Sequence, residues 1–560
     1  SVYRSFSLTY DPDSGCVMSE QGGIDKIGHG TAVYHIIQNM VPKAEITMFR
    51  IFDREAEVDS SQFAAFLEYV GNFEHFDIIN LSLGVTLCEN VSQLYKVCDK
   101  IRKSGTILVS AFDNGGAISF PAAFDNVIGV DASLEYKKIH DYCYIENSIV
   151  NIIGKGTIQR IAWVGPDYII SQGSSFTCAY ISAIVAEILC DGFYGIDQVM
   201  WQLKSRAKAV RGSSPKIPNK KPVPSIKRAV LFPFNKEMHA LIRFQDLLDF
   251  SIVGICDVAK SGRVGMPASK ILNTDKIACD FIIEDIHKLD MEQFDTMILG
   301  HTDELSALLG KPNFVHELLH DLNRHNKQVY AFDDFTESEG TIYSCRIDHA
   351  DVPENRFGKL FQIPKPVLNI VGTSSKQGKF TLQLWLRRRF LEDGYKVGQL
   401  GTEPSSLLFG MDAVFPCGYN TAIHIFNEEI LLYLNTIIWE ISQKDKDIII
   451  TGSQAGVLSY ATYNTNTYPL VHQQFLQAVV SDALIICVNP FDELLFVQSC
   501  ISVAEALSQG KVIAAVCFPL KMKDSWSGAL GDKEYLSKDE INVLKERYRK
   551  ELQLPLYILG

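Results

Sequence analysis

Three short glycine-containing motifs in the N-terminal third of the chain carry the side-chain types of an acyl-transfer centre. They are Gly28-His29-Gly30-Thr31, Asp113-Asn114-Gly115-Gly116 and Gly173-Ser174-Ser175-Phe176. A serine hydroxyl attacks a carbonyl carbon, a histidine takes the hydroxyl proton, and an amide donor stabilises the oxyanion that forms. The three side chains His29, Ser175 and Asn114 therefore predict hydrolysis or transfer of an acyl group.

Periodic patterns place these side chains at the ends of secondary-structure elements. An apolar run with helical spacing follows His29, so this residue is expected at a helix start. Ser175 precedes an apolar helix expected over 180–189, where the first backbone N–H groups face developing negative charge. Asn114 follows a strand expected over 105–110, beside two glycines that let a substrate approach. These positions suit a base, a nucleophile and an oxyanion donor.

Each motif alone also has a purely structural interpretation. An isolated histidine is most often structural or solvated, Gly-Ser-Ser is commonly a loop, and Asn-Gly-Gly is commonly a turn. The set is more specific, because its order resembles the His-Gly-Thr, Asn-x-Gly and Gly-Thr-Ser-x-Ala motifs of the subtilisin-like serine proteases, the subtilases. Residues 79–84 resemble the subtilase strand that pairs with substrate and lines the primary specificity pocket, and 121–130 also have a subtilase counterpart.

The resemblance covers about residues 1–211 and implies a role for each side chain. His29 is the implied general base, Ser175 the nucleophile and Asn114 the oxyanion donor. This sequence departs from the subtilase motif around the nucleophile at three places. Ser174 replaces the usual Thr, Thr177 the usual Ala, and Cys178-Ala179 the usual Ser-Pro. Loss of that proline removes a preference for starting a helix and no reactive group.

The carboxylate that orients the histidine is the missing part of the pattern. A subtilase places this Asp about 30 residues before the His, in a buried strand that ends in Asp-Ser/Thr-Gly. Asp13-Ser14-Gly15 matches by letters, but it lies too near His29 and follows a stretch, 8–12, that is not a buried apolar strand. We expect the orienting Asp upstream of Ser1, and Asp25 resembles the family's acidic residue at the cleft wall. Without its carboxylate the histidine takes the wrong tautomer, at a loss of about 10⁴ in kcat.

A second candidate site lies in the C-terminal third. A strand expected over 367–371 leads into Gly372-Thr373-Ser374-Ser375-Lys376-Gln377-Gly378-Lys379-Phe380-Thr381 and then an apolar helical run. Strand, glycine-rich turn and helix N-terminus together form a phosphate-binding loop. The spacing departs from the strict P-loop pattern and resembles dethiobiotin-synthetase-like P-loop proteins and a poorly characterised Rossmann-plus-P-loop family.

This second resemblance implies contacts from Gly372, Gly378 and Lys379 to phosphates and from Thr381 to Mg²⁺. ATP or another nucleotide is the implied ligand. Thr451 stands where such proteins place an acidic residue, which weakens the case for hydrolysis more than that for binding. A structural glycine turn is the alternative. In the middle segment, Asp257 is either a reader of a ribose hydroxyl or, more commonly, an ordinary strand-end residue.

Proline-rich stretches divide the chain into three α/β segments. Residues 211–224 contain four prolines, and 349–366 form a second candidate linker. The predicted domains are a subtilisin-like domain over 1–211, a Rossmann-like domain over 226–350 and a P-loop NTPase-like domain over 364–560. Strands are expected at 44–49, 76–83, 105–110, 126–130, 228–232, 251–256, 296–299, 328–332, 367–371, 447–450, 483–488 and 512–518, with helices at 61–70, 91–103 and 237–249.

Composition limits the classes of partner that we expect and indicates the cellular compartment. The formal net charge is −13, so neither nucleic acid nor an anionic membrane is an expected partner. No apolar run is long enough to span a bilayer, and the first residues lack the features of a signal peptide. The 13 cysteines contain no Cys-x-x-Cys pair, which argues against structural zinc and for a reducing compartment. A cytoplasmic location is expected.

The sequence as a whole predicts a serine endopeptidase that needs no cofactor or metal for proteolysis. Its two halves together resemble proteins of bacterial peptide maturation systems, so a ribosomally made precursor peptide is the implied substrate. Two alternatives stay open. The first is a non-catalytic, regulatory P-loop protein whose degenerate protease domain only binds peptide. The second is a peptide-modifying ligase or kinase driven by the P-loop domain.

Overall fold

The computed structural model describes residues 3–559, apart from 12, 53–57, 213–222, 273, 275–276, 303–304, 306–307, 312, 336–341, 354–357, 376, 419–421, 461–462, 464–467 and 523–532. The chain forms two compact units. Unit 1 comprises Ser1–Lys216 with Glu354–Pro364, and unit 2 comprises Ile217–Pro353 with Lys365–Gly560. Most of the first proline-rich linker, 211–224, lies outside the described residues.

Unit 1 is built on a six-stranded sheet with the order β11-β7-β8-β6-β5-β4. Its strands are parallel except for the antiparallel pair β7–β8. Every residue of β5 is buried, because this strand is covered on both faces. The strands are β4 (Ile78–Leu81), β5 (Ile107–Ala111), β6 (Ile128–Ser133), β7 (Cys143–Ile145), β8 (Ile152–Lys155) and β11 (Ala209–Arg211).

Two smaller sheets complete the strands of unit 1. The antiparallel hairpin β1–β2 is extended by β3, which lies parallel to β1, and β9 pairs with β10. Only Leu8 of β1 is buried. The strands are β1 (Tyr3–Asp11), β2 (Cys16–Gln21), β3 (Ile46–Arg50), β9 (Gln159–Ala162) and β10 (Tyr168–Ser171).

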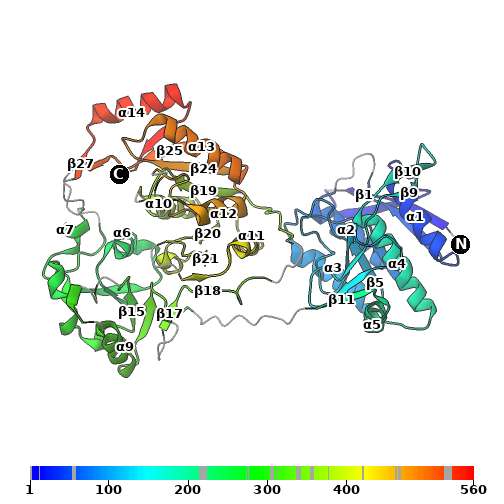
Figure 1. The fold of residues 1–560 in the computed structure, drawn as a ribbon, viewed down its shortest axis with the longest axis horizontal. Helices are drawn as coiled ribbons and strands as arrows, with labels where there is room; N and C mark the ends of the chain where they lie inside the picture. Colours follow the sequence, from blue (N-terminus) through cyan, green and yellow to red (C-terminus); the bar gives the residue numbers. More distant parts are fainter. Residues whose placement is uncertain are drawn as a thin grey trace. The chain divides into compact units, whose positions relative to one another are not determined.

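The helices of unit 1 include a buried one, α4, that runs beside the helix carrying the histidine. Most side chains of α4 are buried, and they pack both on the central sheet and on α1. Figure 1 shows the ribbons of α4 and α1 in this unit. An all-round apolar helix is expected to be buried in this way. The helices are α1 (His29–Met40), α2 (Ser60–Phe73), α3 (Val91–Lys103), α4 (Ser174–Cys190) and α5 (Ile196–Arg206).

Unit 2 contains two all-parallel sheets. The first has the order β14-β13-β12-β15-β16-β17 and the second β21-β20-β23-β19-β24-β25-β28. A single apolar cluster includes Leu231 of the first part and Leu384 of the second, so the two parts share a core. The strands of the first sheet are β12 (Arg228–Phe232), β13 (Ser251–Asp257), β14 (Glu284–Asp285), β15 (Thr296–Leu299), β16 (Gln328–Ala331) and β17 (Ile342–Ser344).

The second sheet carries the phosphate-loop region. Its strands are β19 (Val367–Gly372), β20 (Val397–Gly401), β21 (Ala413–Val414), β23 (Ile448–Gly452), β24 (Ala483–Val488), β25 (Lys511–Cys517) and β28 (Leu556–Ile558), and β18 (Ile347–Asp348) pairs with β22 (Ile423–His424). The helices of unit 2 are α6 (His239–Arg243), α7 (Ala268–Leu272), α9 (Phe314–Arg324), α10 (Lys379–Glu392), α11 (Asn427–Ser442), α12 (Leu470–Val479), α13 (Leu494–Ser508) and α14 (Lys538–Glu551). The prediction of parallel α/β architecture in all three segments is confirmed.

The helix expected over 237–249 is wrong in its length. The chain forms α6 over five residues, with short 3-10 turns before and after it. Met238, Leu241 and Ile242 are all fully buried, and Phe244 is nearly so. The backbone leaves helical geometry at Phe244, which has φ −124° and ψ 40°, and it is extended at Leu248. The four side chains still reach one core cluster, so the core does not require a continuous helix.

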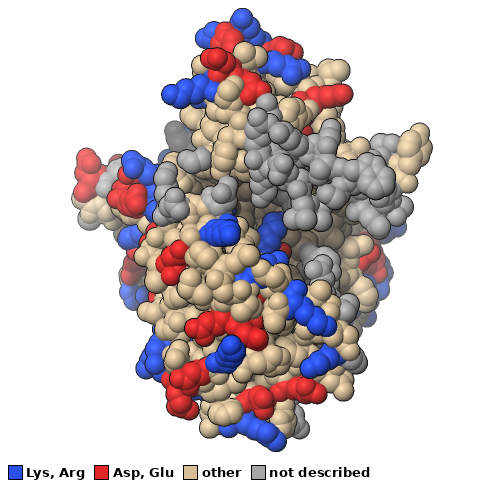
Figure 2. All heavy atoms as spheres, turned by 90° about the vertical axis from the view of Figure 1, so that its left-hand side faces the viewer, with Lys and Arg blue, Asp and Glu red and all other residues tan. Residues whose placement is uncertain are grey.

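The surface carries both signs of charge. On the face shown in Figure 2, Lys and Arg side chains alternate with Asp and Glu side chains, separated by neutral residues. Among the described helices, none has the length and hydropathy needed to cross a bilayer. The cysteines whose side chains are described are free thiols, and most are buried.

Candidate active site

The first turn of α4 carries the candidate nucleophile. Ser175 is the second residue of this helix, and Gly173 precedes it with φ 157° and no side-chain cap. The first N–H groups of a helix lack intrahelical acceptors and carry its positive dipole end. The Ser175 hydroxyl forms no hydrogen bond within the described part of the chain, and the residue is half-buried. The hydroxyl is thus available at a position that favours negative charge.

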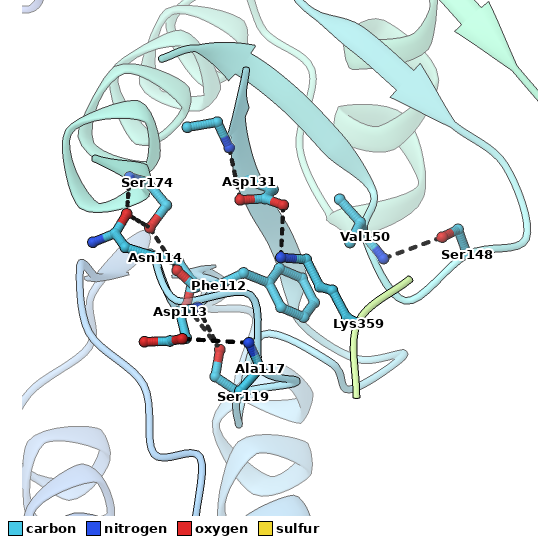
Figure 3. Close-up of polar contacts among 12 residues, drawn as sticks. Phe112, Asp113, Asn114, Ala117, Ser119, Asp131, Ser148, Val150, Ser174 and Lys359 are labelled. Atoms are coloured by element: carbon cyan, nitrogen blue, oxygen red, sulfur yellow. Dashed lines mark hydrogen bonds and ion pairs between the residues drawn. The ribbon is translucent and has the colours of Figure 1, made fainter. Parts of the chain in front are cut away.

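Asn114 is held against this first turn by Ser174. The Asn114 Oδ1 accepts hydrogen bonds from the Ser174 backbone N at 2.9 Å and the Ser174 Oγ at 3.1 Å (Figure 3). The single Ser174 hydroxyl proton is shared with the Phe112 carbonyl oxygen, which lies 2.5 Å from the Ser174 Oγ. Because the amide oxygen is the acceptor, the Asn114 Nδ2 keeps its two N–H donors. Asn114 is exposed, so these donors can meet a substrate oxyanion.

His29 begins α1 and lies against the residue that follows Ser175. The His29 and Phe176 rings have centroids 5.7 Å apart and planes tilted by 36°. The helices behind them pack through an apolar cluster that includes Val33 and Ala179. Burial lowers the pKa of His29 below its ordinary value, and the charge of Asp25 partly offsets this shift. The ring is therefore neutral near pH 7, which is the form that accepts a proton.

Asp25 shapes the start of α1. Its carboxylate accepts from the Gly28 N at 2.8 Å, the Thr31 N at 2.7 Å and the Thr31 Oγ1 at 2.8 Å. Burial raises the pKa of Asp25, but these hydrogen bonds outweigh burial and hold the pKa below its ordinary value. Asp25 thus fixes the loop that presents His29. Within the described residues no carboxylate is hydrogen-bonded to the His29 ring.

Asp13-Ser14-Gly15 lies in the exposed turn between β1 and β2. The Ser14 Oγ donates to Asp11 at 2.6 Å, and the Asp13 N donates to the same carboxylate at 3.1 Å. Asp13 itself is exposed. The letter match therefore belongs to a turn and not to a buried strand end.

A polar network joins the end of β4 to α4. The Asn80 Oδ1 accepts from the Ser182 Oγ at 2.9 Å, and the Asn80 Nδ2 donates to the Ser82 Oγ at 2.9 Å. The Ser82 Oγ in turn donates to the Ser175 carbonyl oxygen at 2.8 Å. The Cys178 thiol also contacts Asn80, at 3.3 Å. The sequence singled out 79–84 only as a substrate strand, and this positioning role of Asn80 was missed, because it depends on partners about 100 residues away.

The structure gathers the three predicted side chains around the starts of α1 and α4. Asn114 and Ser175 are joined through Ser174, and His29 reaches the same turn through Phe176. No hydrogen bond links the His29 ring to the Ser175 hydroxyl in the described residues. The arrangement brings a serine hydroxyl, an amide donor and a neutral imidazole around one helix turn. The catalytic assignments themselves stay predictions.

The predicted phosphate loop joins β19 to α10, and its side chains fold inward. The Gln377 Oε1 accepts from the Ser374 N at 3.0 Å, and the Gln377 Nε2 donates to the Thr373 Oγ1 at 2.5 Å. The Lys379 Nζ donates to the Ser374 carbonyl oxygen at 2.6 Å. Gly372 faces both side chains, since a Cβ there would lie 2.5 Å from the Gln377 Oε1. In this conformation the Ser374 N–H donates to Gln377, so this donor is not available to a phosphate.

A buried lysine and a helix N-terminus lie at the loop. Lys379 is only 4% exposed, and burial lowers its pKa to about 8. Gly378 has φ 78°, a left-handed conformation that suits glycine, and offers no side-chain cap to α10. Thr381 is half-buried in the first turn of the helix. Among the described residues, the Lys379 ammonium and the N-terminus of α10 lack a hydrogen-bonded counter-charge, which a phosphate would provide.

Buried polar groups without partners lie near this loop. The Thr451 Oγ1, both Gln383 amide atoms and both His472 ring nitrogens have no hydrogen-bond partner in the described chain. Burial, with the nearby Lys379 charge, lowers the pKa of His472 to about 3, so the ring is neutral. Among the described residues, no group of three His, Cys, Asp or Glu side chains could hold a metal ion.

Asp492 supplies the acidic side chain that the sequence did not assign to the loop. Its carboxylate accepts from the Thr373 Oγ1 and, at 2.8 Å, from the Asn489 N. The Asn489 Nδ2 donates to the Ser374 Oγ at 3.1 Å. In the sequence Asp492 ends the run Asn489-Pro490-Phe491-Asp492 after a buried strand, a signal too weak to assign it to the loop. Asp257 is fully buried and paired with Arg263 at 3.1 Å, which is a structural role.

Sequence reasoning also missed a group of polar residues at the point where the strand order of the first sheet of unit 2 reverses. Strand order reverses between β12 and β15, and Asn235 and His301 follow the carboxyl ends of these strands. The His301 Nδ1 lies 2.6 Å from Asp333 Oδ1. Burial lowers the pKa of His301, but the hydrogen bond and charge of Asp333 outweigh burial and hold this pKa above its ordinary value. Burial and the Glu237 charge raise the pKa of Glu403 to about 6.

Fold and site together define a subtilisin-like domain linked to a P-loop domain. Residues 3–211 match the model of the Subtilase family, and residues 355–558 match the model described as "Domain of unknown function (DUF1611_C) P-loop domain". The chain thus joins a subtilase-family domain to a P-loop domain whose function is unknown. The predicted family resemblance is confirmed for both parts.

Individual relatives cover parts of the chain. The minor extracellular protease Epr of Bacillus subtilis (strain 168) is 25% identical over 175 residues, which are 29% of this chain and 26% of that relative. The chain therefore spans about a quarter of the length of this curated relative. A DUF1611 family protein from Anabaena variabilis ATCC 29413 is 14% identical, with a TM-score of 0.42, over 59% of this chain and 95% of that one. A cold-adapted subtilisin-like serine proteinase is 20% identical, with a TM-score of 0.30, over 36% and 74%.

Proposed function

We propose that the subtilase-family domain is a serine endopeptidase that works through an acyl-enzyme. The observation that supports this most is the Ser174–Asn114 contact, which places a free amide donor beside the helix turn of Ser175. The family match over 3–211 supports the same function.

The reaction divides the work among three side chains. The Ser175 Oγ attacks the peptide carbonyl carbon while the neutral His29 ring takes the hydroxyl proton. The Asn114 Nδ2 and the backbone N–H of Ser175 bind the oxyanion. The intermediate collapses to an ester on Ser175, and the amine leaves with the proton from His29. Water, deprotonated by His29, then hydrolyses the ester and restores Ser175.

We propose a ribosomally made precursor peptide as the substrate. The end of β4 supports a peptide ligand, because 79–84 lie next to Ser175 through the Ser82 hydrogen bond. A peptide that binds there in extended form would place its carbonyl at the Ser175 hydroxyl. The free thiols of the described cysteines support a reducing compartment, and we propose the cytoplasm.

The phosphate loop is proposed to bind ATP or another nucleotide. Lys379, buried without a hydrogen-bonded carboxylate among the described residues, and the uncapped start of α10 fit a phosphate group. Gly372 and Gly378 would let the loop close around it. Mg²⁺, when bound with the nucleotide, would neutralise phosphate charge, and Thr381 would be its hydroxyl ligand.

A non-catalytic peptide-binding domain is the second candidate. It is favoured by one observation, that no carboxylate among the described residues is hydrogen-bonded to His29. In that case the domain would bind peptides and the P-loop domain would carry the activity or the regulation.

A fluorophosphonate probe separates the two functions. The probe is applied to this chain and to a chain extended upstream, each beside its Ser175→Ala variant. Labelling that disappears in Ser175→Ala establishes a working nucleophile. Stronger labelling of the extended chain would place the orienting Asp before Ser1. If folded proteins of both lengths stay unlabelled, the endopeptidase proposal is wrong and peptide binding is the remaining function of the domain.

A further inference from the structure

A short stretch of the C-terminal half folds as part of unit 1. Residues Glu354–Pro364 belong to unit 1, although they precede β19 in the chain. We call Gly358–Pro364 the docking segment. It has no helix or strand, as expected for the proline-punctuated stretch 349–366, but Lys359 is buried and not solvated.

The docking segment contacts the end of the loop that carries Asn114. The Leu360 carbonyl oxygen accepts from the Ile118 N at 2.9 Å. The Phe361 ring stacks on Phe120, with centroids 6.4 Å apart and planes 18° apart. Ile118 and Phe120, at the end of the loop, are therefore both in contact with the docking segment.

Lys359 reaches the start of the same loop. Its Nζ pairs with Asp131 at 2.9 Å and lies 5.4 Å from the centre of the Phe112 ring (Figure 3). The Lys359 side chain is 7% exposed and that of Asp131 18%. A lysine buried to this degree depends on its acidic partner, so the pair fixes its position. Phe112 is the residue whose carbonyl oxygen accepts from the Ser174 Oγ.

The docking segment also contacts the stretch after β4. The Gln362 Oε1 accepts from the Thr86 Oγ1 at 2.9 Å. Val85, next to Thr86, forms two 2.9 Å backbone hydrogen bonds with Phe120. One segment thus holds both the oxyanion loop and the end of the proposed substrate strand.

We propose that the docking segment is a positioning element of the oxyanion site, and this inference rests on the proposed protease function. Asn114 is followed by Gly115 and Gly116, which leave its loop backbone free to move. Ser174 holds the loop from the side of the nucleophile, and Lys359 and Leu360 hold it from the other side. A misplacement of about 1 Å can cost on the order of 10²-fold in rate. The docking segment therefore acts on kcat more than on peptide affinity.

The test uses the full chain with Lys359→Ala, Asp131→Lys and the swapped pair Asp131→Lys/Lys359→Asp. Lys100→Ala is the matched control, because Lys100 pairs with Glu68 at 3.2 Å on an exposed surface. Three measurements are made under conditions where circular dichroism shows folded protein. They are amide hydrogen exchange over 112–120, steady-state kinetics that give kcat and KM for a peptide, and probe labelling of Ser175.

We expect Lys359→Ala and Asp131→Lys each to speed exchange over 112–120 and to lower kcat, by about tenfold or more, with KM within about threefold. The swapped pair should recover both values to within about threefold, and Lys100→Ala should change neither. Unchanged exchange in Lys359→Ala overturns the inference. Faster exchange with unchanged kcat also overturns it, since the contact is then only structural. If the parent chain never labels at Ser175, the protease proposal fails, and exchange alone still decides whether the segment holds the loop.

Discussion

The Asn114 side chain accepts two hydrogen bonds from Ser174, the residue immediately before the candidate nucleophile. This contact does two things at once. It fixes the distance between the oxyanion donor and the first turn of α4, and it orients the amide so that its nitrogen faces outward. A serine at position 174 supplies both the backbone and the hydroxyl donor, so the departure from the usual threonine keeps the contact.

Removing the Asn114 amide should therefore reduce catalysis without weakening peptide binding. We expect Asn114→Leu to lower kcat by about 10² to 10³, with KM within about threefold, because the donor acts mainly on the transition state. Steady-state kinetics on a peptide substrate measures both values. Asn90→Ala, which removes an exposed helix cap of α3, is the control for the loss of an asparagine. An equal loss in both variants would contradict the oxyanion role.

The rate of Ser175 labelling should show an acid limb with a midpoint below pH 6.5. Only neutral His29 accepts the proton, and burial lowers its pKa, so the neutral form persists to lower pH than for an exposed histidine. Asp25 raises this pKa, so Asp25→Asn should move the midpoint further down. Labelling rates between about pH 4.5 and 8 measure the midpoint. A midpoint clearly above 6.5 would instead indicate a carboxylate partner on the His29 ring.

The Asn80 network should contribute strongly to the stability of unit 1. Asn80→Ala removes the acceptor of the buried Ser182 hydroxyl and one partner each of the Ser82 hydroxyl and the Cys178 thiol. We expect the free energy of unfolding to fall by about 2–4 kcal/mol, since each unpaired buried group costs about 1–3 kcal/mol. Urea unfolding measures the change. Asn39→Ala, on the exposed face of α1, should stay within about 0.5 kcal/mol of the parent; a similar loss in both would disprove the network's role.

Gln377 should weaken ligand binding at the phosphate loop. Its amide oxygen occupies the Ser374 N–H, so a phosphate must displace it. We expect Gln377→Ala to tighten nucleotide binding by about five- to tenfold, the effect of one net hydrogen bond of about 1 kcal/mol. Lys379→Ala should abolish binding. Titration calorimetry with Mg²⁺ and ATP measures both, and Gln477→Ala, on the exposed face of α12, is the control. Weaker binding in Gln377→Ala would show that Gln377 is part of the ligand site.

Nucleotide affinity should also begin to fall at a lower pH than is usual for a lysine site. The pKa of Lys379 is lowered to about 8 by burial, so in the free protein the ammonium is lost as the pH rises through that value. Below about pH 7 the Kd should be constant with respect to this group, and above about pH 8 it should rise by up to tenfold per pH unit. Calorimetry between about pH 7 and 10 gives this profile. A Kd that stays constant to about pH 9.5 would contradict a buried, phosphate-contacting Lys379.

The strands were the most predictable part of the fold. The predicted bounds of β12, β15 and β24 match the structure, because each is an apolar run that ends at polar or turn-forming residues. The helix over 91–103 matches for a related reason, since Leu94, Val97 and Ile101 follow helical spacing and are buried. The helix over 237–249 failed because the chain leaves helical geometry at Phe244, a break that the apolar spacing does not signal.

The site was predictable only where a local motif carries it. His29, Asn114 and Ser175 stand in short glycine-containing patterns, and the structure places them at element ends as expected. Asn80, Gln377 and Lys359 have no such pattern. Their importance comes from contacts with residues distant in sequence or from a side chain that folds back into its own loop. A lysine in a proline-punctuated stretch gives no signal that it is buried beside Asp131.

At the docking segment, the boundary of the P-loop family model does not coincide with the boundary between the two compact units. The family model of the P-loop domain begins at residue 355, so sequence descent assigns Lys359 to the C-terminal half. Its packing assigns the same residue to unit 1. A gene split at the family boundary would leave the protease half with Asp131 unpaired from Lys359 and Phe120 without the Phe361 ring. The subtilase-family domain therefore takes part of its packing from residues that the family model assigns to the P-loop domain.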